Sequence, residues 1–177
     1  MSLIRTLSGK HFDFLNIDPE SICIEDIAAS LSNICRFTGH LDHFYSVAQH
    51  SVMTSYLVPP QLAMEALLHD AAEAYCNDIS SPLKALLPDY QAILGRVEAA
   101  IIQKFGLPEA KSREVKYADL VMLATERRDF DLEDGPVFTQ LEGIEPSPMM
   151  ISPLMPRQAQ VLFLQRYQNL KGEQHGY

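Results

Sequence analysis

The sequence predicts an all-α protein that forms a single helical domain over residues 1–177. Apolar residues recur at spacings of three and four, the period of one helix face, and no run alternates as a half-buried strand does. The length suits one domain, since domains commonly have about 100–200 residues. The hydrophobic fraction of 47% is sufficient for one core. We therefore expect a bundle of about six helices, each with one apolar face.

The first three helices are predicted from periodicity and from a pair of prolines. The first helix covers residues 25–33, and the second covers residues 44–58. The second ends at Pro59 and Pro60, because proline cannot continue a helix. The same prolines can begin the third helix, which continues to about Tyr75, because the first turn needs no amide donor.

Three further helices follow the same reasoning. The fourth covers residues 90–105 and ends before Gly106, since glycine readily adopts the left-handed conformation of a helix C-cap. The fifth covers residues 112–130 and carries Glu114 in its first turn, where the helix dipole favours an acid. The sixth covers residues 157–170.

Residues 131–156 are predicted to form a long loop. This stretch contains two glycines and five prolines, which disfavour regular structure. Long loops in compact domains are commonly lids over a functional site or mobile segments. The alternative is a simple surface excursion between the fifth and sixth helices, and the composition does not separate the two.

Composition excludes several classes of function. The chain has 14 Lys and Arg against 23 Asp and Glu, a net charge of -9. Such a chain is repelled by a phosphate backbone, so we expect no stable binding to nucleic acid. No apolar run approaches the roughly 20 residues of a membrane span, and the N-terminus lacks the apolar stretch of a signal peptide. We expect a cytoplasmic protein that does not associate with membranes.

Ionisable residues interrupt the apolar faces of three predicted helices. They are His50 in the second helix, His69, Asp70 and Glu73 in the third, and Asp119 in the fifth. An unpartnered charge in a core is costly, and one divalent cation would satisfy these groups together. Imidazole and carboxylate donors suit Mn, Fe, Co or Zn. Spacing alone leaves open the alternative that each histidine is satisfied within the core and that Asp119 forms a salt bridge.

Three segments carry a resemblance to a known family. They are Val-Ala-Gln-His-Ser at 47–51, Ala-Leu-Leu-His-Asp-Ala-Ala-Glu-Ala at 66–74 and Tyr-Ala-Asp at 117–119. Their order, a histidine, an adjacent His-Asp pair and a later aspartate, resembles the HD-domain metal-dependent phosphohydrolase superfamily. The resemblance spans about residues 24–130, and the size is similar to a small branch of bacterial 5'-deoxynucleotidases and phage-type dNTP triphosphohydrolases.

The resemblance implies an HD-type helical bundle and a metal site. Within it, His50, His69, Asp70 and Asp119 would hold one divalent ion, namely Co, Mn, Zn or Fe. The superfamily's two-metal members carry further histidines after the His-Asp pair. This chain has none between Asp70 and Asp119, so a single ion is expected.

The resemblance also implies catalytic and substrate-binding residues. Glu73 would position or deprotonate the attacking water, and Asp78 would protonate the leaving oxygen or orient that water. Arg36 would grip the phosphate, and Lys84 would add positive charge. Phe37 stands where the similar deoxynucleotidases have a tryptophan that crowds the sugar 2' position, which makes a strict deoxyribose preference doubtful.

These features predict a phosphohydrolase that converts deoxynucleoside 5'-monophosphates to nucleoside and phosphate. One alternative is a dNTP triphosphohydrolase, for example on dATP, that releases triphosphate. Another is a non-catalytic HD module that binds a nucleotide and regulates a partner. We also expect a homo-oligomer, because the last helix presents an apolar surplus: Val161, Leu162, Leu164 and Tyr167. The charge run at 126–129 is predicted to be a solvated helix end.

Overall fold

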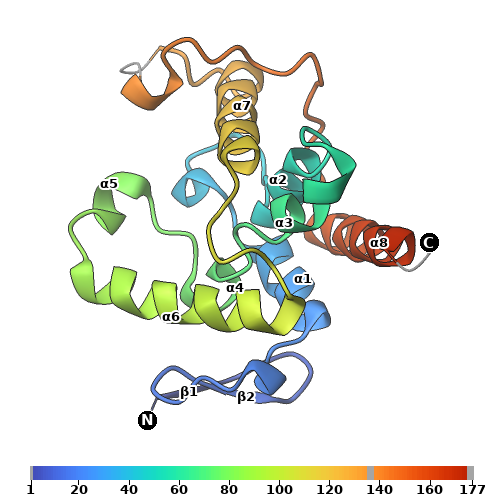
Figure 1. Ribbon diagram of the computed structural model, residues 1–177. Coiled ribbons are helices and arrows are strands. Elements are labelled where there is room, and N and C mark those ends of the chain that lie inside the picture. Colours follow the sequence, from blue (N-terminus) through green and yellow to red (C-terminus); the bar gives the residue numbers. More distant parts are fainter. Residues whose placement is uncertain (1, 135–137, 175–177) are drawn as a thin grey trace.

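The computed structural model of the protein describes residues 2–134 and 138–174 (Figure 1). Within these residues the fold is helical, which confirms the all-α prediction. The eight α-helices are α1 (Ile24–Asn33), α2 (Val47–Thr54), α3 (Ala63–Leu67), α4 (Glu73–Cys76), α5 (Ser81–Lys84), α6 (Pro88–Phe105), α7 (Arg113–Asp129) and α8 (Pro156–Gln174). None of the helices in this part of the chain is both long and apolar enough to cross a bilayer.

A small hairpin precedes the helices and was not predicted. Strands β1 (Leu3–Arg5) and β2 (His11–Asp13) pair antiparallel, with Ile4 opposite Phe12. Phe12 is fully buried and stacks on Tyr75 of α4, with ring centroids 4.2 Å apart. Strands of three residues are too short to show alternation in a sequence, so this element depends on a contact that only the folded chain makes.

The helices surround one main core. α8 packs against α1 and α2, α7 lies over α2 and α3, and α6 crosses the opposite side of the bundle above the hairpin (Figure 1). Three of the four apolar residues of α8 that predicted self-association pack against this core instead. Leu162, Leu164 and Tyr167 pack partly buried against it, and only Val161 among the four residues is exposed, at 41%.

The predicted third helix is wrong as one continuous element. α3 ends before Leu68, α4 begins at Glu73, and turns connect them. The cause is local: the imidazole Nδ1 of His69 lies 2.7 Å from the carbonyl oxygen of Ala66, an acceptor that the amide of residue 70 would use in a continuous helix. The break turns His69 and Asp70 toward α2 and α7.

α2 is shorter than the predicted helix of residues 44–58. An isolated β-bridge joins Cys35 and Ser46, and it keeps the preceding residues extended. The Ser46 hydroxyl then accepts a hydrogen bond from the amide of Gln49 at 3.1 Å, which is an N-cap. The helix that carries His50 therefore begins at a fixed point.

The predicted loop at 131–156 divides into two parts. Its C-terminal part is anchored: Thr125 Oγ1 accepts from the amide of Ser147 at 2.8 Å, and Asp129 accepts from the amide of Ile151 at 2.7 Å. The side chain of Gln49 binds the backbone on either side of Pro153, through the carbonyl of residue 152 and the amide of residue 154. Of the remaining part, residues 135–137 lie outside the described residues, and Phe138–Gln140 lie against the cleft described below.

Candidate metal centre and adjoining cleft

Four side chains from three parts of the fold meet between α2, α3 and α7. His50 comes from the middle of α2, His69 and Asp70 come from the turn after α3, and Asp119 comes from α7. His50 and His69 have fully buried side chains, whereas Asp70 and Asp119 are 19% and 41% exposed. The cluster therefore has a nitrogen face inside the protein and a carboxylate face open to solvent.

The donor atoms of these residues converge on one point. Asp119 Oδ1 lies 3.1 Å from Nε2 of His50 and 3.6 Å from Nε2 of His69. Asp70 Oδ2 lies 3.1 Å from Nε2 of His69 and 3.7 Å from Nε2 of His50. The two Nε2 atoms are 3.3 Å apart. Sequence reasoning selected these four residues, and the structure brings them together.

This arrangement fits a divalent cation. With bonds of about 2.1 Å, neighbouring donors around one ion lie about 3.0–3.4 Å apart, close to the separations seen here. His50, His69 and Asp119 form a group that can hold a metal ion. Two imidazoles with carboxylates suit Mn, Fe, Co or Zn better than Ca.

Electrostatics favours charged groups in this cluster despite its burial. Burial opposes protonation of His69, but Asp70 and Asp119 outweigh it and raise the pKa of His69 to about 10. Burial likewise disfavours the ionised carboxylates, yet the imidazoles hold the pKa of Asp70 and of Asp119 well below the usual range. Protons on the imidazoles thus occupy the place that a cation would take.

Glu126, on α7, is a site residue that sequence reasoning missed. It is fully buried, which corrects the prediction of a solvated helix end at 126–129. Its Oε1 lies 2.6 Å from Nδ1 of His50, and its Oε2 accepts from Nη2 of Arg36 at 2.9 Å. The available signal was its position seven residues after Asp119, on the same inward stripe of the helix.

A cleft of about 630 Å³ opens beside the cluster. Its lining includes the predicted catalytic and substrate-binding residues: Arg36, Phe37, Glu73, Asp78 and Lys84, together with Asp70 and Asp119. Leu120, Leu123, Phe138, Thr139 and Gln140 line it as well. All of the predicted site residues except the two buried histidines therefore share one concave surface of a size typical for small ligands.

Within residues 2–134 and 138–174, two buried polar atoms on residues of this cleft have no hydrogen-bond partner. They are Nε of Arg36 and Oε2 of Glu73. Buried polar groups are nearly always satisfied, so such atoms mark places where a ligand or a water binds. Nε of Arg36 is a cationic donor, which suits an anionic ligand. Oε2 of Glu73 is an acceptor when the carboxyl is ionised, which suits an ordered water beside that ligand.

Burial and charge also perturb the acids of the cleft. Burial, with the negative charges of Asp70 and Asp78, raises the pKa of Glu73 to about 9. Lys84 Nζ, 3.6 Å from Glu73 Oε1, opposes that shift. Burial raises the pKa of Asp78 as well. Perturbed acids gathered in one cleft are typical of catalytic sites.

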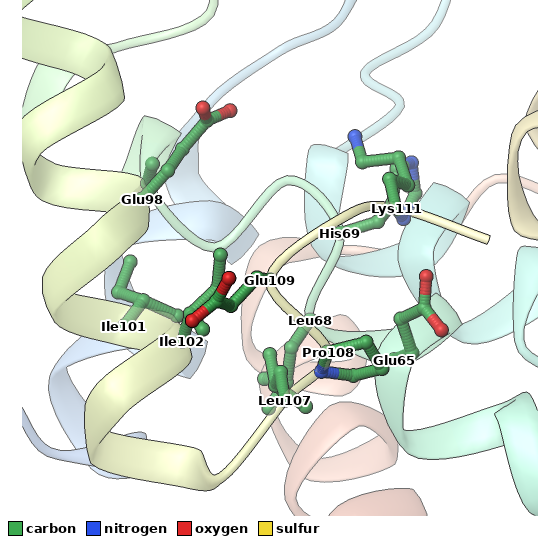
Figure 2. A pocket seen from close by; sticks show the side chains of 11 residues that line it. Glu65, Leu68, His69, Glu98, Ile101, Ile102, Leu107, Pro108, Glu109 and Lys111 are labelled. Carbon is green, nitrogen blue, oxygen red and sulfur yellow. The ribbon is translucent and has the colours of Figure 1, made fainter.

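A smaller cavity of about 140 Å³ lies behind His69 (Figure 2). Glu98, Ile101 and Ile102 of α6 form one side (Figure 2). The segment between α6 and α7 and residues from α3 to α4, namely Glu65, Leu68, His69 and Ala72, form the rest. Its charged residues are mainly acidic, with three glutamates and one lysine. The larger cleft, at about 630 Å³, has the volume that a small-molecule ligand needs, and this cavity does not.

The backbone of the cleft wall is strained next to Arg36. Phe37 and Thr38 have φ angles of 54° and 55°, in the left-handed region that non-glycine residues rarely adopt. The guanidinium of Arg36 lies over the Phe37 ring, 5.6 Å from its centroid. Strain of this kind persists where surrounding structure requires a particular side-chain position.

Comparison with known proteins places the chain among bacterial relatives. It is 56% identical over 171 residues to the uncharacterized protein YfdR of Escherichia coli K12, and the match covers 96% of each chain. It is 37% identical over 131 residues to an uncharacterized protein of Rhodobacter capsulatus, covering 66% of this chain and 67% of that protein. No protein-family model matches the chain. The chain belongs to the same family as YfdR of Escherichia coli.

Proposed function

We propose that this protein is an HD-type, metal-dependent phosphohydrolase that acts on nucleotides, and that deoxynucleoside 5'-monophosphates are its main substrates. The observation that carries the proposal is the convergence of four ligand atoms at the wall of a cleft that also holds Arg36 and Glu73. Each of these two residues has a buried polar atom without a partner. Metal ligands, an anion-binding group and a candidate base in one cleft support phosphate-ester hydrolysis.

The cluster would hold one divalent cation through His50, His69, Asp70 and Asp119. When bound, such an ion supplies Lewis acidity and lowers the pKa of a coordinated water. The exposed carboxylates of Asp70 and Asp119 lie on the cleft side, so the open side of the cluster faces the substrate.

Arg36 is the residue that would bind the phosphate. Its side chain is largely buried, at 13% exposure, and the guanidinium keeps its charge because Glu126 lies beside it. A partly desolvated guanidinium binds phosphoryl oxygens more strongly than an exposed one, and it stabilises the charge that develops on them. Lys84 lines the same cleft and supplies a second positive charge.

The two acids of the cleft, Glu73 and Asp78, would carry out proton transfer. Glu73 Oε2 accepts a proton from the attacking water, whose oxygen forms a bond to phosphorus while the bond from phosphorus to the sugar oxygen breaks. Asp78 donates a proton to that leaving oxygen. The raised pKa of Asp78, caused by burial, suits an acid, and Glu73 requires nearby positive charge to ionise at neutral pH.

The rest of the cleft suits a nucleoside. Phe37, Leu120, Leu123 and Phe138 provide apolar surface, and Thr139 and Gln140 provide hydrogen-bonding groups beside it. A surface with both characters matches a base and its sugar. The cleft volume of about 630 Å³ is ample for a single nucleotide.

The charges of the cleft favour a monophosphate over a triphosphate. Within the described residues, Arg36 and Lys84 are the only cationic side chains that line it, against four carboxylates. Both cations already face an acid, Arg36 at Glu126 and Lys84 at Glu73. A triphosphate needs more positive charge than these two groups and one ion provide.

The decisive experiment is product analysis with a panel of nucleotides. Mono-, di- and triphosphates of both sugars would be incubated with Mn, Co or Zn, or with chelator. We expect metal-dependent release of inorganic phosphate from deoxynucleoside monophosphates. Release of intact triphosphate from dNTPs would instead support the triphosphohydrolase alternative. Metal binding without turnover of any nucleotide would support the regulatory module.

A matched pair of variants makes that assay specific for the cluster. Asp119→Asn removes a ligand charge and should abolish turnover. Asp89→Asn removes an exposed carboxylate from the start of α6 and should leave turnover unchanged. Equal activity of the two variants would contradict the proposed site.

A further inference from the structure

Glu126 divides its two oxygens between the metal cluster and the phosphate-binding arginine. Oε1 lies 2.6 Å from Nδ1 of His50, and Oε2 lies 2.9 Å from Nη2 of Arg36. The side chain is fully buried, so water does not compete for either oxygen. Arg36 and His50 are 90 and 76 residues from Glu126 in sequence, respectively, so each contact forms only in the folded chain.

The contact with His50 determines how that imidazole can bind a cation. A carboxylate accepts but does not donate, so the shared proton resides on Nδ1 of His50. In the neutral imidazole that binds a cation, the lone pair of Nε2 then lies on the side of Asp119 Oδ1 and His69 Nε2, which are 3.1 and 3.3 Å away. A carboxylate behind a ligating histidine fixes its tautomer and ring orientation and raises its basicity.

The contact with Arg36 orients the guanidinium. Because Nη2 is held by Glu126, the planar group can turn little about its axis. Its other terminal nitrogen, Nη1, lies 4.0 Å from Asp70 Oδ2, beside the cluster. Its Nε has no partner, although the side chain lines the cleft. The free donors are thereby kept at a defined distance from the metal ligands.

We infer that Glu126 is a positioning residue that links metal binding at His50 to phosphate binding at Arg36. The inference rests on the proposed function, since it assigns roles to both partners within that site. A single substitution at this position should therefore weaken two properties together, the affinity for metal and the affinity for substrate.

Glu126→Gln is the most informative substitution, because it keeps the size of the side chain but replaces one of its two acceptor oxygens with a donor. An amide has one acceptor oxygen, whereas His50 Nδ1 and Arg36 Nη2 both donate. Whichever partner the oxygen binds, the amide NH2 meets the other donor. Glu114→Gln is the matched control, because Glu114 is exposed on the first turn of the same helix.

The first readout is metal affinity, measured by titration calorimetry with Mn or Zn alone. We expect about 10- to 100-fold weaker binding in Glu126→Gln, the range seen when such supporting groups are removed, and no change in Glu114→Gln. At saturating metal, the KM for the phosphate substrate should remain raised, because Arg36 is no longer held. A purely structural defect would lower the fraction of active protein and leave KM unchanged.

A second readout uses the unaltered protein and does not depend on whether the variant folds. In ¹⁵N-labelled protein loaded with Zn, His50 should carry its proton on Nδ1 and bind the ion through Nε2. Nitrogen chemical shifts distinguish that tautomer from the reverse.

The outcomes separate the inference from the proposed function. If the unaltered protein binds no metal, the proposed function fails. If it binds metal but Glu126→Gln binds equally well with an unchanged KM, or if His50 carries its proton on Nε2, the inference about Glu126 is overturned.

Discussion

Nε2 of His50 lies 3.3 Å from Nε2 of His69, although α2 carries one imidazole and the turn after α3 carries the other. Neither side chain is exposed. Two protonated imidazoles at this separation repel each other, and the carboxylates of Asp70, Asp119 and Glu126 compensate for that repulsion. A cation bound by the two nitrogens would replace this repulsion with favourable metal–ligand interactions.

Metal should therefore stabilise the fold. A ligand at 100 times its Kd adds about 2.7 kcal/mol to the free energy of unfolding. For a chain of this length, that corresponds to a rise in Tm of about 5–10 °C. Thermal unfolding with Mn, Co, Zn or Fe and with chelator measures the difference, and an unchanged Tm with all four metals would argue against the site.

The affinity for metal should rise with pH. In the metal-free protein, Asp70 and Asp119 overcome the effect of burial and raise the pKa of His69 to about 10, so His69 is protonated at neutral pH. A metal must displace that proton, and binding becomes easier as pH approaches 10. Calorimetry in buffers of different ionisation enthalpy should show proton release at pH 7. The expectation is wrong if no proton is released.

The metal-free protein should also lose stability as pH rises. A histidine whose pKa is raised from 6.5 to about 10 on folding stabilises the native state fully below pH 6.5. That contribution declines as pH rises toward 10. Urea unfolding of chelator-treated protein between pH 6 and pH 10 tests the direction, while metal-loaded protein should show a smaller decline because metal excludes the proton.

Glu73→Gln should separate catalysis from metal binding. The amide keeps the shape of the side chain but cannot accept the proton of the attacking water, and loss of a general base costs about 10²- to 10⁴-fold in rate. Because Glu73 is not a metal ligand in the proposed site, its substitution should leave metal affinity within a few-fold. Glu98→Gln, an exposed position on α6, is the control for kcat. A Glu73→Gln variant with full activity would remove Glu73 from the mechanism.

Arg36→Ala should destabilise the protein as well as weaken substrate binding. Among the described residues, His50 is the ion-pair partner that the buried charge of Glu126 keeps when Arg36 is removed. Leaving a buried charge without its partner costs about 3–5 kcal/mol, and His50 should keep the cost near the lower end. Urea unfolding measures this loss of free energy, and Arg96→Ala, at an exposed position on α6, is the control. A loss below about 1 kcal/mol would show that Glu126 does not require Arg36.

Glu65→Ala tests how α7 is attached to the bundle. Both oxygens of Glu65 accept from Ser112 at the start of α7, one from its amide and one from its hydroxyl, each at 2.6 Å. Removing a charged acceptor of hydrogen bonds costs about 1.5–3 kcal/mol. Glu109→Ala, which is exposed nearby, should cost much less. Urea unfolding of both variants gives the comparison. If Glu65→Ala and Glu109→Ala lower the free energy of unfolding equally, Glu65 does not anchor α7.

Much of the helical framework was predictable from local sequence. α1, α6, α7 and α8 lie within a few residues of the predicted ranges, because periodic apolar faces, prolines and Gly106 act over a few residues of chain. The selection of His50, His69, Asp70 and Asp119 as candidate ligands also depended only on residue type, spacing and the resemblance those segments carry.

Contacts between distant segments decided the rest. The hairpin is held by Phe12 against Tyr75, and Glu126 is buried because His50 and Arg36 meet it from other parts of the fold. A charged run at a helix end is ordinarily solvated, so the run at 126–129 favoured a surface position for Glu126 even though helix periodicity places it on the inward face of α7. Local sequence sets which face a helix presents, but whether a carboxylate on that face meets water or two buried donors depends on what the folded chain packs against it.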